Sequence, residues 1–294
     1  MKRVLVVGSV NMDYTVYTNS FPLPGETIFG VSRFIQPGGK GENQAIAIAK
    51  SHKVICDFIG AIGNDSDGKA IQEVLKQNEV NAHLKVIDEA ETGNATIVVN
   101  KESENEIIII SGANGLLELK DIDIELLKQA DYLVLQNEIS EKTNEFLMKK
   151  AKELGKIVVY NPAPYRPLKE ELFSCLDYFI PNRIEFKNYS GTDDIEKGVK
   201  ALLSKGVKNV LITLGTDGSV LYNKTETIKV DACKVKAIDT VAAGDTYVGY
   251  FVSSLASGYS VEESMKLASK ASSITVTRKG SVVSIPKGEE VYEK

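Results

Sequence analysis

Short, continuous runs of apolar residues recur along most of the chain and predict buried β-strands. The runs are Val4–Val7, Val54–Ile59, Tyr132–Leu135, Ile157–Tyr160, Tyr178–Ile180 and Val210–Thr213. Because the apolar residues in each run are consecutive rather than alternating, we expect both faces of the sheet to be covered. Amphipathic stretches between the runs predict helices, at residues 69–77, 141–154 and 194–205. Strands that alternate with helices in this way indicate an α/β fold with a mostly parallel sheet.

Two segments interrupt that alternation, residues 14–36 and residues 84–112. Both contain strand-like stretches joined by turn residues, and neither shows a helical pattern. We predict that the two segments pair with each other into a small separate β-sheet, a lid over one end of the main sheet. Since no linker of Pro, Gly or Ser and no internal repeat divides the chain, we expect one α/β domain, residues 1–294, with the lid inserted.

Composition and charge exclude several classes of function. The chain has 35 Lys and Arg against 40 Asp and Glu, a net charge of −5, and the basic residues are scattered, so nucleic-acid binding is not expected. Two histidines and three widely spaced cysteines predict neither a zinc site nor a disulfide framework, which favours a cytoplasmic location. No run approaches the roughly 20 apolar residues of a membrane span, so no membrane partner is expected.

Two motifs predict helix starts that can bind an anion. In the glycine-rich motif at residues 38–43, the backbone can approach a ligand closely while Lys40 and Asn43 project from the start of an Ala-rich helix. In the motif at residues 239–245, small side chains leave backbone amides uncovered beside the carboxylate of Asp245. Donors for a phosphoryl group beside an acid that can take a hydroxyl proton are what phosphorylation of an alcohol requires. A solvated glycine turn and a helix-capping acid are the alternatives for these two motifs taken singly.

Polar residues also follow several of the predicted strands. They are Asn137, Glu138, Asn161, Asn182, Glu185, Thr213 and Gly215. Because the carboxyl ends of parallel strands meet at one edge of a sheet, we expect these residues to border a common ligand site.

Together these motifs resemble those of the ribokinase-like (pfkB-type) carbohydrate kinases, in the family's order from Val4 to Pro286. The resemblance implies a ribokinase-like three-layer α/β sandwich with a mostly parallel central sheet and a small β-sheet lid. It also implies ATP-dependent phosphorylation of a sugar, with the 5-hydroxyl of D-ribose as the leading acceptor. The alternatives are another pentose, a ketohexose or a nucleoside as substrate, or a sugar-binding regulator that has lost catalysis.

The resemblance also implies a role for each motif residue. Asp245 would be the general base, and the amides of Ala243 and Gly244, with Lys40, would hold the transferred phosphoryl group. The sugar hydroxyls would be bound by Asn11, Asp13, Gly39, Lys40, Asn43, Glu138 and Asp245. The nucleotide would lie along Asn182, Thr213, Gly215, Gly218, Gly244 and Ser269.

Two cations and a dimer complete what the resemblance implies. Glu185 would organise Mg²⁺ beside ATP, through water. K⁺ would be bound by the side chains of Asp239 and Ser284 and by the carbonyls of Val241, Thr275, Arg278 and Gly280. Family members often dimerise through the lid, so a homodimer is expected.

Three positions carry residues that are unusual for the family. Glu42 would add an acceptor near the sugar, and Arg183 would add a partner for a phosphate. Ser269 replaces a larger polar residue near the adenine, so the choice of nucleotide is less firmly predicted.

Overall fold

A nine-stranded sheet forms the centre of the computed structural model, which describes residues 1–102 and 104–293. The strand order is β13-β12-β11-β10-β9-β8-β1-β4-β5. The strands are β1 (Arg3–Val7), β4 (Ile55–Gly63), β5 (Asn81–Ile87), β8 (Tyr132–Leu135), β9 (Ile157–Tyr160), β10 (Tyr178–Phe179), β11 (Asn209–Thr213), β12 (Ser219–Tyr222) and β13 (Thr227–Val230). Pairing is parallel from β11 to β5, and β12 and β13 add an antiparallel edge. The predicted mostly parallel α/β sheet is confirmed.

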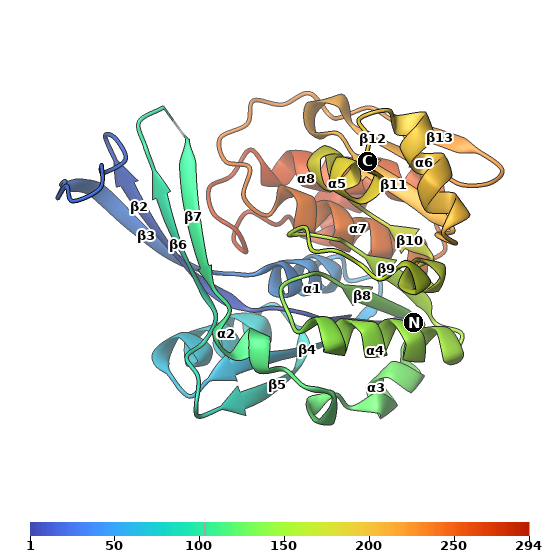
Figure 1. Ribbon diagram of the computed structural model, residues 1–294, viewed down its shortest axis with the longest axis horizontal. Helices are drawn as coiled ribbons and strands as arrows, with labels where there is room; N and C mark the ends of the chain where they lie inside the picture. The colour runs from blue at the N-terminus through green and yellow to red at the C-terminus, as the bar shows by residue number, and fades with distance from the viewer. Residues whose placement is uncertain (103, 294) are drawn as a thin grey trace.

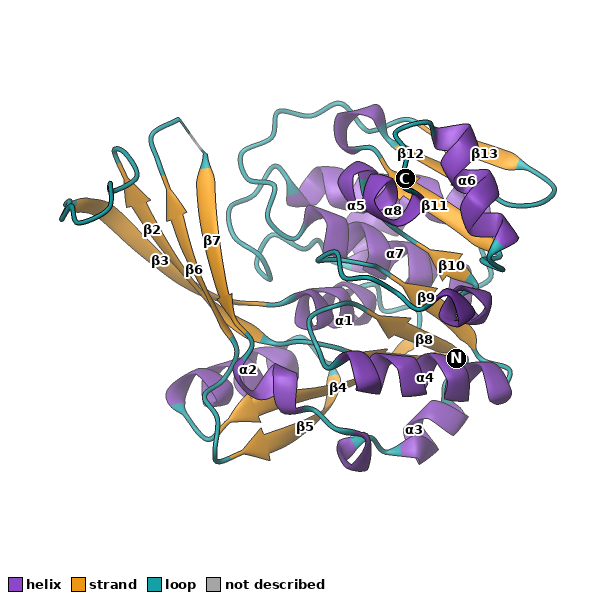
Figure 2. Ribbon diagram, in the orientation of Figure 1, coloured by secondary structure: helices purple, strands orange, loops and turns teal. Residues whose placement is uncertain are grey.

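Helices cover both faces of this sheet, so the fold has three layers (Figures 1 and 2). One face packs against α1 (Lys40–Lys50), α2 (Ser66–Gln77), α7 (Ala243–Ala256), α8 (Val261–Thr275) and α9 (Gly288–Tyr292). The other packs against α3 (Ile124–Gln129), α4 (Glu141–Glu153), α5 (Arg183–Ser190) and α6 (Ile195–Ser204). Successive side chains of β1 alternate between the two cores, Val4 and Val6 in one and Leu5 and Val7 in the other. Across the described residues, no helix has the length and apolarity that crossing a bilayer requires.

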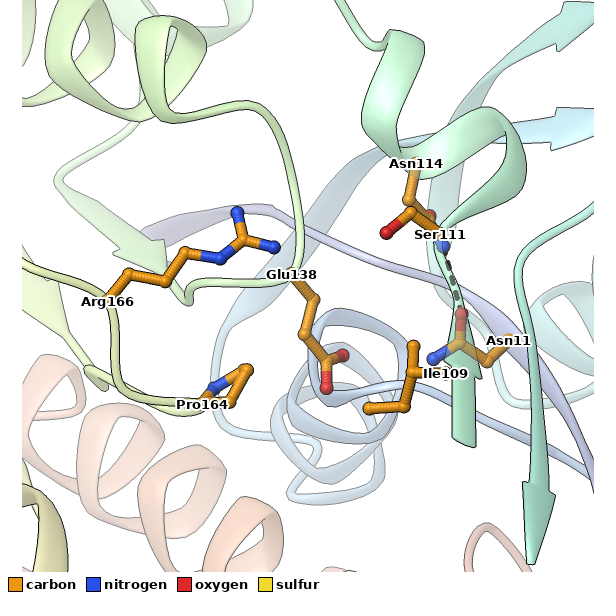
Figure 3. Close-up of a pocket in the computed structure, with 7 residues that line it drawn as sticks. All are labelled: Asn11, Ile109, Ser111, Asn114, Glu138, Pro164 and Arg166. Atoms are coloured by element: carbon orange, nitrogen blue, oxygen red, sulfur yellow. Dashed lines mark hydrogen bonds between the residues drawn. The ribbon is translucent and has the colours of Figure 1, made fainter. Parts of the chain in front are cut away.

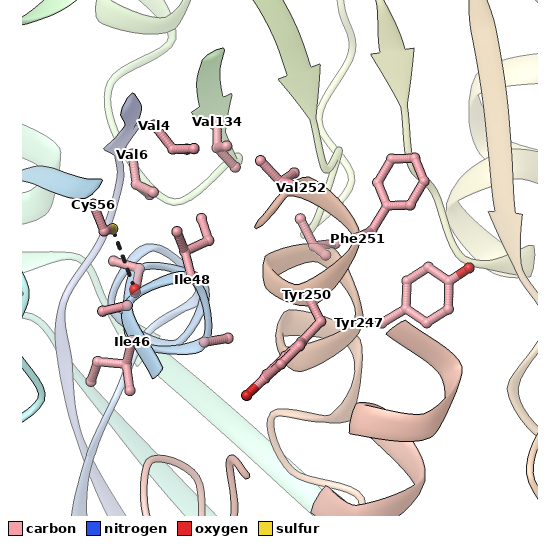
Figure 4. Close-up of a cluster of buried hydrophobic side chains, with 14 of the residues drawn as sticks. Val4, Val6, Ile46, Ile48, Cys56, Val134, Tyr247, Tyr250, Phe251 and Val252 are labelled. Carbon is pink, nitrogen blue, oxygen red and sulfur yellow. Dashed lines mark hydrogen bonds between the residues drawn. The ribbon is translucent and has the colours of Figure 1, made fainter. Parts of the chain in front are cut away.

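Close packing of α1 against α7 fixes the relative position of the two helix starts that the sequence singled out. Ile46 and Ile48 of α1 lie in the same core as Tyr250 and Val252 of α7 (Figure 4). A Cβ on Gly249 of α7 would lie 2.5 Å from the Cβ of Ala47, so no larger residue fits there without movement. Because the contact is this tight, the first turns of α1 and α7 are held as one rigid unit.

A separate four-stranded sheet stands beside the main one as the predicted lid (Figure 1). Its order is β3-β2-β6-β7, with β2 (Asn11–Thr18), β3 (Gly30–Gly38), β6 (Asn94–Val99) and β7 (Asn105–Ile110). The second lid segment begins later than the predicted residue 84, because Asn81–Ile87 pairs in parallel with β4 in the main sheet. This strand lies at the sheet edge, where its side chains alternate in exposure. Its sequence pattern is therefore like that of a strand in a sheet with one exposed face, such as the lid.

Candidate active site

The candidate site lies where the carboxyl ends of the parallel strands meet the start of the lid. Two cavities of about 190 and 200 Å³ lie there. The polar residues of the first, here called the α7 cavity, are Lys40, Asn161, Asn182, Glu185, Thr213, Thr240 and Asp245. Those of the second, the lid cavity, are Asn11, Ser111, Asn114, Glu138 and Arg166 (Figure 3). The strand ends and both glycine-containing motifs therefore converge as predicted.

The start of α7 presents two free amides to the α7 cavity. Ala242 precedes the helix in the left-handed conformation, with φ 59° and no side-chain cap. The amide of Ala243 donates to the Thr240 carbonyl at 3.3 Å, whereas those of Gly244 and Asp245 have no acceptor among the described residues. A Cβ on Gly244 would meet no atom within 4 Å, so this position is open. The helix start can therefore receive an anion through Gly244 and Asp245, while the Ala243 amide is already engaged.

The Asp245 carboxylate is held by two side chains from the first turns of α1. Asn43 Nδ2 donates to Asp245 Oδ2 at 3.2 Å, and Gln44 Nε2 donates to Asp245 Oδ1 at 2.9 Å. Asp245 is buried, and it borders the α7 cavity beside Lys40. A carboxylate fixed in this way at a helix start is suited to accept a proton from a group bound in the cavity.

Lys40 borders the α7 cavity and bonds to Glu138, which borders the lid cavity. Its backbone amide donates to Glu138 Oε2 at 3.0 Å, and Ser9 Oγ donates to the same oxygen at 2.5 Å. The negative charge of Asp245 is the largest cause that raises the pKa of Lys40, with Glu138 and other acids adding to it against the effect of burial. The ammonium group therefore stays charged, and it supplies local positive charge that a chain with net charge −5 otherwise lacks.

Asp13 on β2 lies in the same electrostatic environment. Burial is the largest cause that raises its pKa, and the charges of Glu138 and Asp245 add to it, giving a pKa of about 7. Lys40 opposes this rise. Protonation of Asp13 near neutral pH would turn one carboxylate oxygen into a donor and weaken the other as an acceptor, so the binding of hydroxyl groups at this site is expected to depend on pH.

The remaining predicted sugar ligands carry unused hydrogen-bonding capacity. Asn11 Oδ1 accepts from Asn114 Nδ2 at 2.9 Å, and Asn11 borders the lid cavity (Figure 3). Asn43 Oδ1 is buried and has no partner within the described parts of the chain. Gly39 has φ 94°, and a Cβ there would come within 2.9 Å of the Asn11 amide nitrogen, so glycine is required for the close approach of these backbones.

Asn182, Glu185 and Thr213 meet in the α7 cavity as predicted. Asn182 and Glu185 form a capping box at the start of α5, with both reciprocal bonds at 2.8 Å. Glu185 uses Oε2 for this bond, and burial raises the pKa of its carboxyl. An isolated parallel bridge joins Asn182 to Thr213. Oxygen donors of this kind suit Mg²⁺ and its waters, so the residues present fit that ion.

Three predicted nucleotide residues do not border either cavity. Gly215 is in the left-handed region with open space around it, whereas a Cβ on Gly218 would lie 2.1 Å from the Val230 carbonyl oxygen. Gly218 thus satisfies a tight turn between strands. Ser269 is buried, and its hydroxyl donates to the Asp231 carbonyl at 3.3 Å.

The predicted monovalent-cation residues come from two loops that the structure brings together. Asp239 accepts from the Val241 amide at 3.0 Å and from the Gly280 amide at 2.9 Å, which ties the two loops. Thr275, at the end of α8, and Ser284 are both buried. The Thr275 carbonyl accepts from the Arg278 amide at 3.0 Å. In the part of the chain that is described, no cluster of three or more His, Cys, Asp or Glu could hold a metal. A cation here would depend on carbonyl oxygens, a donor set that fits K⁺.

The expectation that Glu42 adds an acceptor beside the sugar is not met. Its side chain is wholly buried and it borders neither cavity. Arg183 pairs instead with Asp217, at 3.1 Å on the surface, where such a pair contributes little to stability.

The sequence interpretation assigned no role to several residues that shape the site, among them Ser9, Gln44 and Arg166. Gln44 lies one turn after Lys40 in α1, and this i, i+4 spacing was the available signal. Arg166 donates to the Ile139 carbonyl at 3.1 Å and borders the lid cavity. Nothing in its local sequence pattern indicates either contact.

Comparisons with known proteins match the sequence over almost its whole length and the fold. The family model described as "pfkB family carbohydrate kinase" matches residues 1–288. A ribokinase of Haemophilus influenzae is 37% identical over 301 residues, covering 99% of this chain and 98% of that protein. A crystal structure of ribokinase from Thermotoga maritima superposes with a TM-score of 0.92 at 38% identity, covering 99% and 98% of the two chains. The structure of Arabidopsis thaliana ribokinase complexed with ribose and ATP gives a TM-score of 0.91 at 31% identity, covering 99% and 98%.

Proposed function

Because this chain belongs to the pfkB family of carbohydrate kinases, we propose that it transfers the γ-phosphoryl group of ATP to the 5-hydroxyl of D-ribose. One observation carries the proposal. The carboxylate of Asp245, the free amides of Gly244 and Asp245, and the charged Lys40 border a single cavity. Phosphorylation of an alcohol requires a base, hydrogen-bond donors for the anionic phosphoryl group and a positive charge beside it.

Asp245 acts as the general base. The oxygen of the sugar hydroxyl forms the new P–O bond, the bond between the γ-phosphorus and its bridging oxygen breaks, and ADP leaves. The hydroxyl proton passes to Asp245. A carboxylate suffices as base because the transition state is loose, so the hydroxyl becomes acidic only as the new bond forms. The amides of Gly244 and Asp245 and the ammonium group of Lys40 stabilise the charge on the phosphoryl oxygens.

The other sugar hydroxyls are bound by the acceptor-rich set at the lid end of the site. Asp13 and Glu138 accept hydrogen bonds from the sugar hydroxyls, and the buried, unpartnered Asn43 Oδ1 offers a further acceptor. Asn11 donates through Nδ2, and the backbone at Gly39 approaches the sugar because no side chain intervenes. A ligand with several neighbouring hydroxyls matches this arrangement better than an apolar or anionic one.

The nucleotide binds along the strand ends next to α7. Asn182 and Thr213 contact it, together with the loop that holds Gly215 and the more distant Gly218 and Ser269. Glu185 holds Mg²⁺ through water. When bound with the nucleotide, Mg²⁺ neutralises charge on the phosphates.

A potassium ion would bind beside the anion-binding helix start. The side chains of Asp239 and Ser284 and the carbonyls of Val241, Thr275, Arg278 and Gly280 would hold it. The bonds from Asp239 to the Val241 and Gly280 amides support this proposal because they join the two ligand-bearing loops. When bound there, the ion supplies positive charge close to the start of α7.

The protein is a homodimer that associates through the lid. The chain is one α/β domain, and the lid is inserted as residues 14–36 and as the part of 84–112 that follows β5. Large apolar side chains are exposed on the lid strands and loops, including Phe29 at 97% and Ile108 at 66% exposure. Exposed apolar groups on one sheet favour association. Free Cys56, Cys175 and Cys233 favour a reducing, cytoplasmic location.

A panel of acceptors tests the substrate. ADP release is followed with D-ribose, 2-deoxyribose, fructose, adenosine and tagatose 6-phosphate as acceptors, under the same ATP and Mg²⁺ conditions. We expect the highest kcat/KM with ribose. An equal or higher kcat/KM with another acceptor would overturn the choice of ribose, and ribose binding without transfer to any acceptor would indicate a sugar-binding regulator.

A further inference from the structure

Side-chain amides that are bonded to one another lead from Asp245 into the core. Gln44 of α1 and Gln136, the residue after β8, are both wholly buried. Gln44 Nε2 donates to Asp245 Oδ1 at 2.9 Å and to Asn161 Oδ1 at 3.1 Å, and Gln44 Oε1 accepts from Gln136 Nε2 at 2.7 Å. Asn144 Nδ2 of α4 in turn donates to the Gln136 carbonyl at 2.6 Å. Among the described residues, Gln44 alone thus donates to this carboxylate oxygen, and it is tied in turn to Asn161 and Gln136.

The acceptor oxygens of Asp245 and Asn161 fix which end of the Gln44 amide faces them, and the bond from Gln136 Nε2 to Gln44 Oε1 holds that orientation. In the opposite orientation, Gln44 Oε1 would face the acceptor oxygens of Asp245 and Asn161, and both hydrogen bonds would be lost. Gln136 directs its Nε2 to Gln44 even though its own Oε1 is buried without a partner, against the backbone of Gly8. Such an unmet acceptor is unfavourable, so the orientation of Gln136 is determined by the bond to Gln44.

The two oxygens of Asp245 therefore have different environments. Oδ1 is bound by the wholly buried Gln44, whose two N–H donors are both used and whose oxygen accepts from Gln136. Oδ2 is bound at a longer distance, 3.2 Å, by Asn43, a residue with an unused buried acceptor. Oδ2 is thus the oxygen with the less constrained surroundings, next to the predicted sugar ligand.

We propose that Gln44 is the positioning residue for the base: held by Gln136, it anchors Oδ1 of Asp245 and leaves Oδ2 to accept the proton of the sugar hydroxyl. This inference rests on the proposed function, since it concerns how the base of that reaction is oriented. Gln44 borders neither cavity, so it acts through Asp245 rather than on the sugar.

The Gln44→Met variant tests the proposal because methionine has a similar length and cannot donate. Loss of a hydrogen bond to a charged group should lower kcat by about 10- to 100-fold. The KM for sugar and its dissociation constant without ATP, measured by calorimetry, should change less than about threefold, because the sugar contacts remain. The acidic limb of the pH profile of kcat should move to higher pH, since a donor to the charged carboxylate is lost. Lys40, Asp13 and Glu185, which also act on this carboxylate, are unchanged in the variant.

Gln136→Met provides the second variant, since it touches neither Asp245 nor the cavities. We expect the same set of changes as in Gln44→Met but smaller ones, with kcat about 3- to 10-fold lower, because Gln44 loses the donor that holds its orientation. Ser264→Ala is the matched control for a buried polar substitution: its hydroxyl is buried without a partner, in the first turn of α8. This control should retain the kcat of the wild type.

The possible results separate this inference from the proposed function. A wild-type chain that phosphorylates no sugar overturns both. With an active wild type, an unchanged kcat in Gln44→Met, or a loss confined to KM and sugar affinity, overturns the positioning role alone. If Gln44→Met does not fold, an unchanged kcat and pH profile in Gln136→Met overturns it equally.

Discussion

Glu42 makes the chain sensitive to pH, and replacing it should stabilise the protein. The residue stands in the first turn of α1, wholly buried, and neither carboxylate oxygen has a partner among the described residues. Burial, with the nearby charge of Asp13, raises the pKa of Glu42 well above its ordinary value of 4.5. The folded protein therefore keeps this carboxyl protonated at a pH where the unfolded chain has lost the proton.

The size of the effect follows from proton linkage. A group whose folded pKa is raised gives its full stability below its unfolded pKa, and that stability is lost as the pH rises toward the folded pKa. Between the two pKa values the native state binds one more proton than the unfolded state, so the free energy of unfolding falls by about 1.4 kcal/mol per pH unit. Glu42→Gln removes this slope. Glu42→Met also removes the unpartnered polar atoms, which should raise the free energy of unfolding by about 1–3 kcal/mol. Each added kcal/mol should raise Tm by about 2–4 °C.

Urea unfolding at pH 5, 6 and 7 measures both quantities, followed by far-UV circular dichroism because the chain has no Trp. The stability of each variant relative to the wild type should increase with pH from pH 5 upward. Subtraction removes the contribution of Asp13, which titrates in the same direction in all three proteins. Glu89→Gln, at an exposed turn, controls for the loss of one negative charge and should run parallel to the wild type. If the curves for Glu42→Gln and the wild type are also parallel, the account of Glu42 as a buried, unpaired acid is refuted.

Four further predictions follow from the site and the lid. Asp245→Asn should lower kcat by about 10²- to 10⁴-fold with a smaller change in sugar affinity, and turnover like that of the wild type would refute the base. The kcat/KM for ribose should fall below about pH 7, because the pKa of Asp13 is raised to about 7 and its protonated form is a weaker acceptor for the sugar hydroxyls than the carboxylate; a flat profile from pH 6 to 8 would contradict this. K⁺ should raise both activity and Tm relative to tetramethylammonium, and equal values would remove the proposed cation site. Ile108→Lys on the lid should shift the sedimentation of the protein from dimer to monomer, and unchanged sedimentation would rule out this face of the lid as the interface.

The sequence was sufficient for the main sheet and the lid because burial on both faces leaves a continuous apolar run. Val4–Val7 and Ile157–Tyr160 are examples, since neighbours on both sides and helices on both faces exclude water from them. Residues 84–87, the second half of the strand Asn81–Ile87, are predicted for the lid instead, because an edge strand alternates in exposure. Local pattern carries no information on which sheet such a strand joins.

The predicted site residues were those that stand in motifs, since helix starts and strand ends mark backbone groups available to a ligand. The motif at residues 239–245 identified the free amides, but not that the Ala243 amide would bond to Thr240. The bonds between Gln44 and Gln136 join residues 92 positions apart, so they depend on the fold rather than on any local spacing. For the same reason the sequence could not show that Glu42 turns into the core.

Identification of the product tests the central claim most directly. The wild type and Asp245→Asn are incubated with ATP, Mg²⁺ and D-ribose, and the products are examined by phosphorus NMR against standards of ribose 1-phosphate and ribose 5-phosphate. We predict ribose 5-phosphate in an amount equal to the ADP formed by the wild type, and little or none from the variant in the same time. A phosphate ester at another hydroxyl, or no ester of ribose from the wild type, would contradict the proposed function.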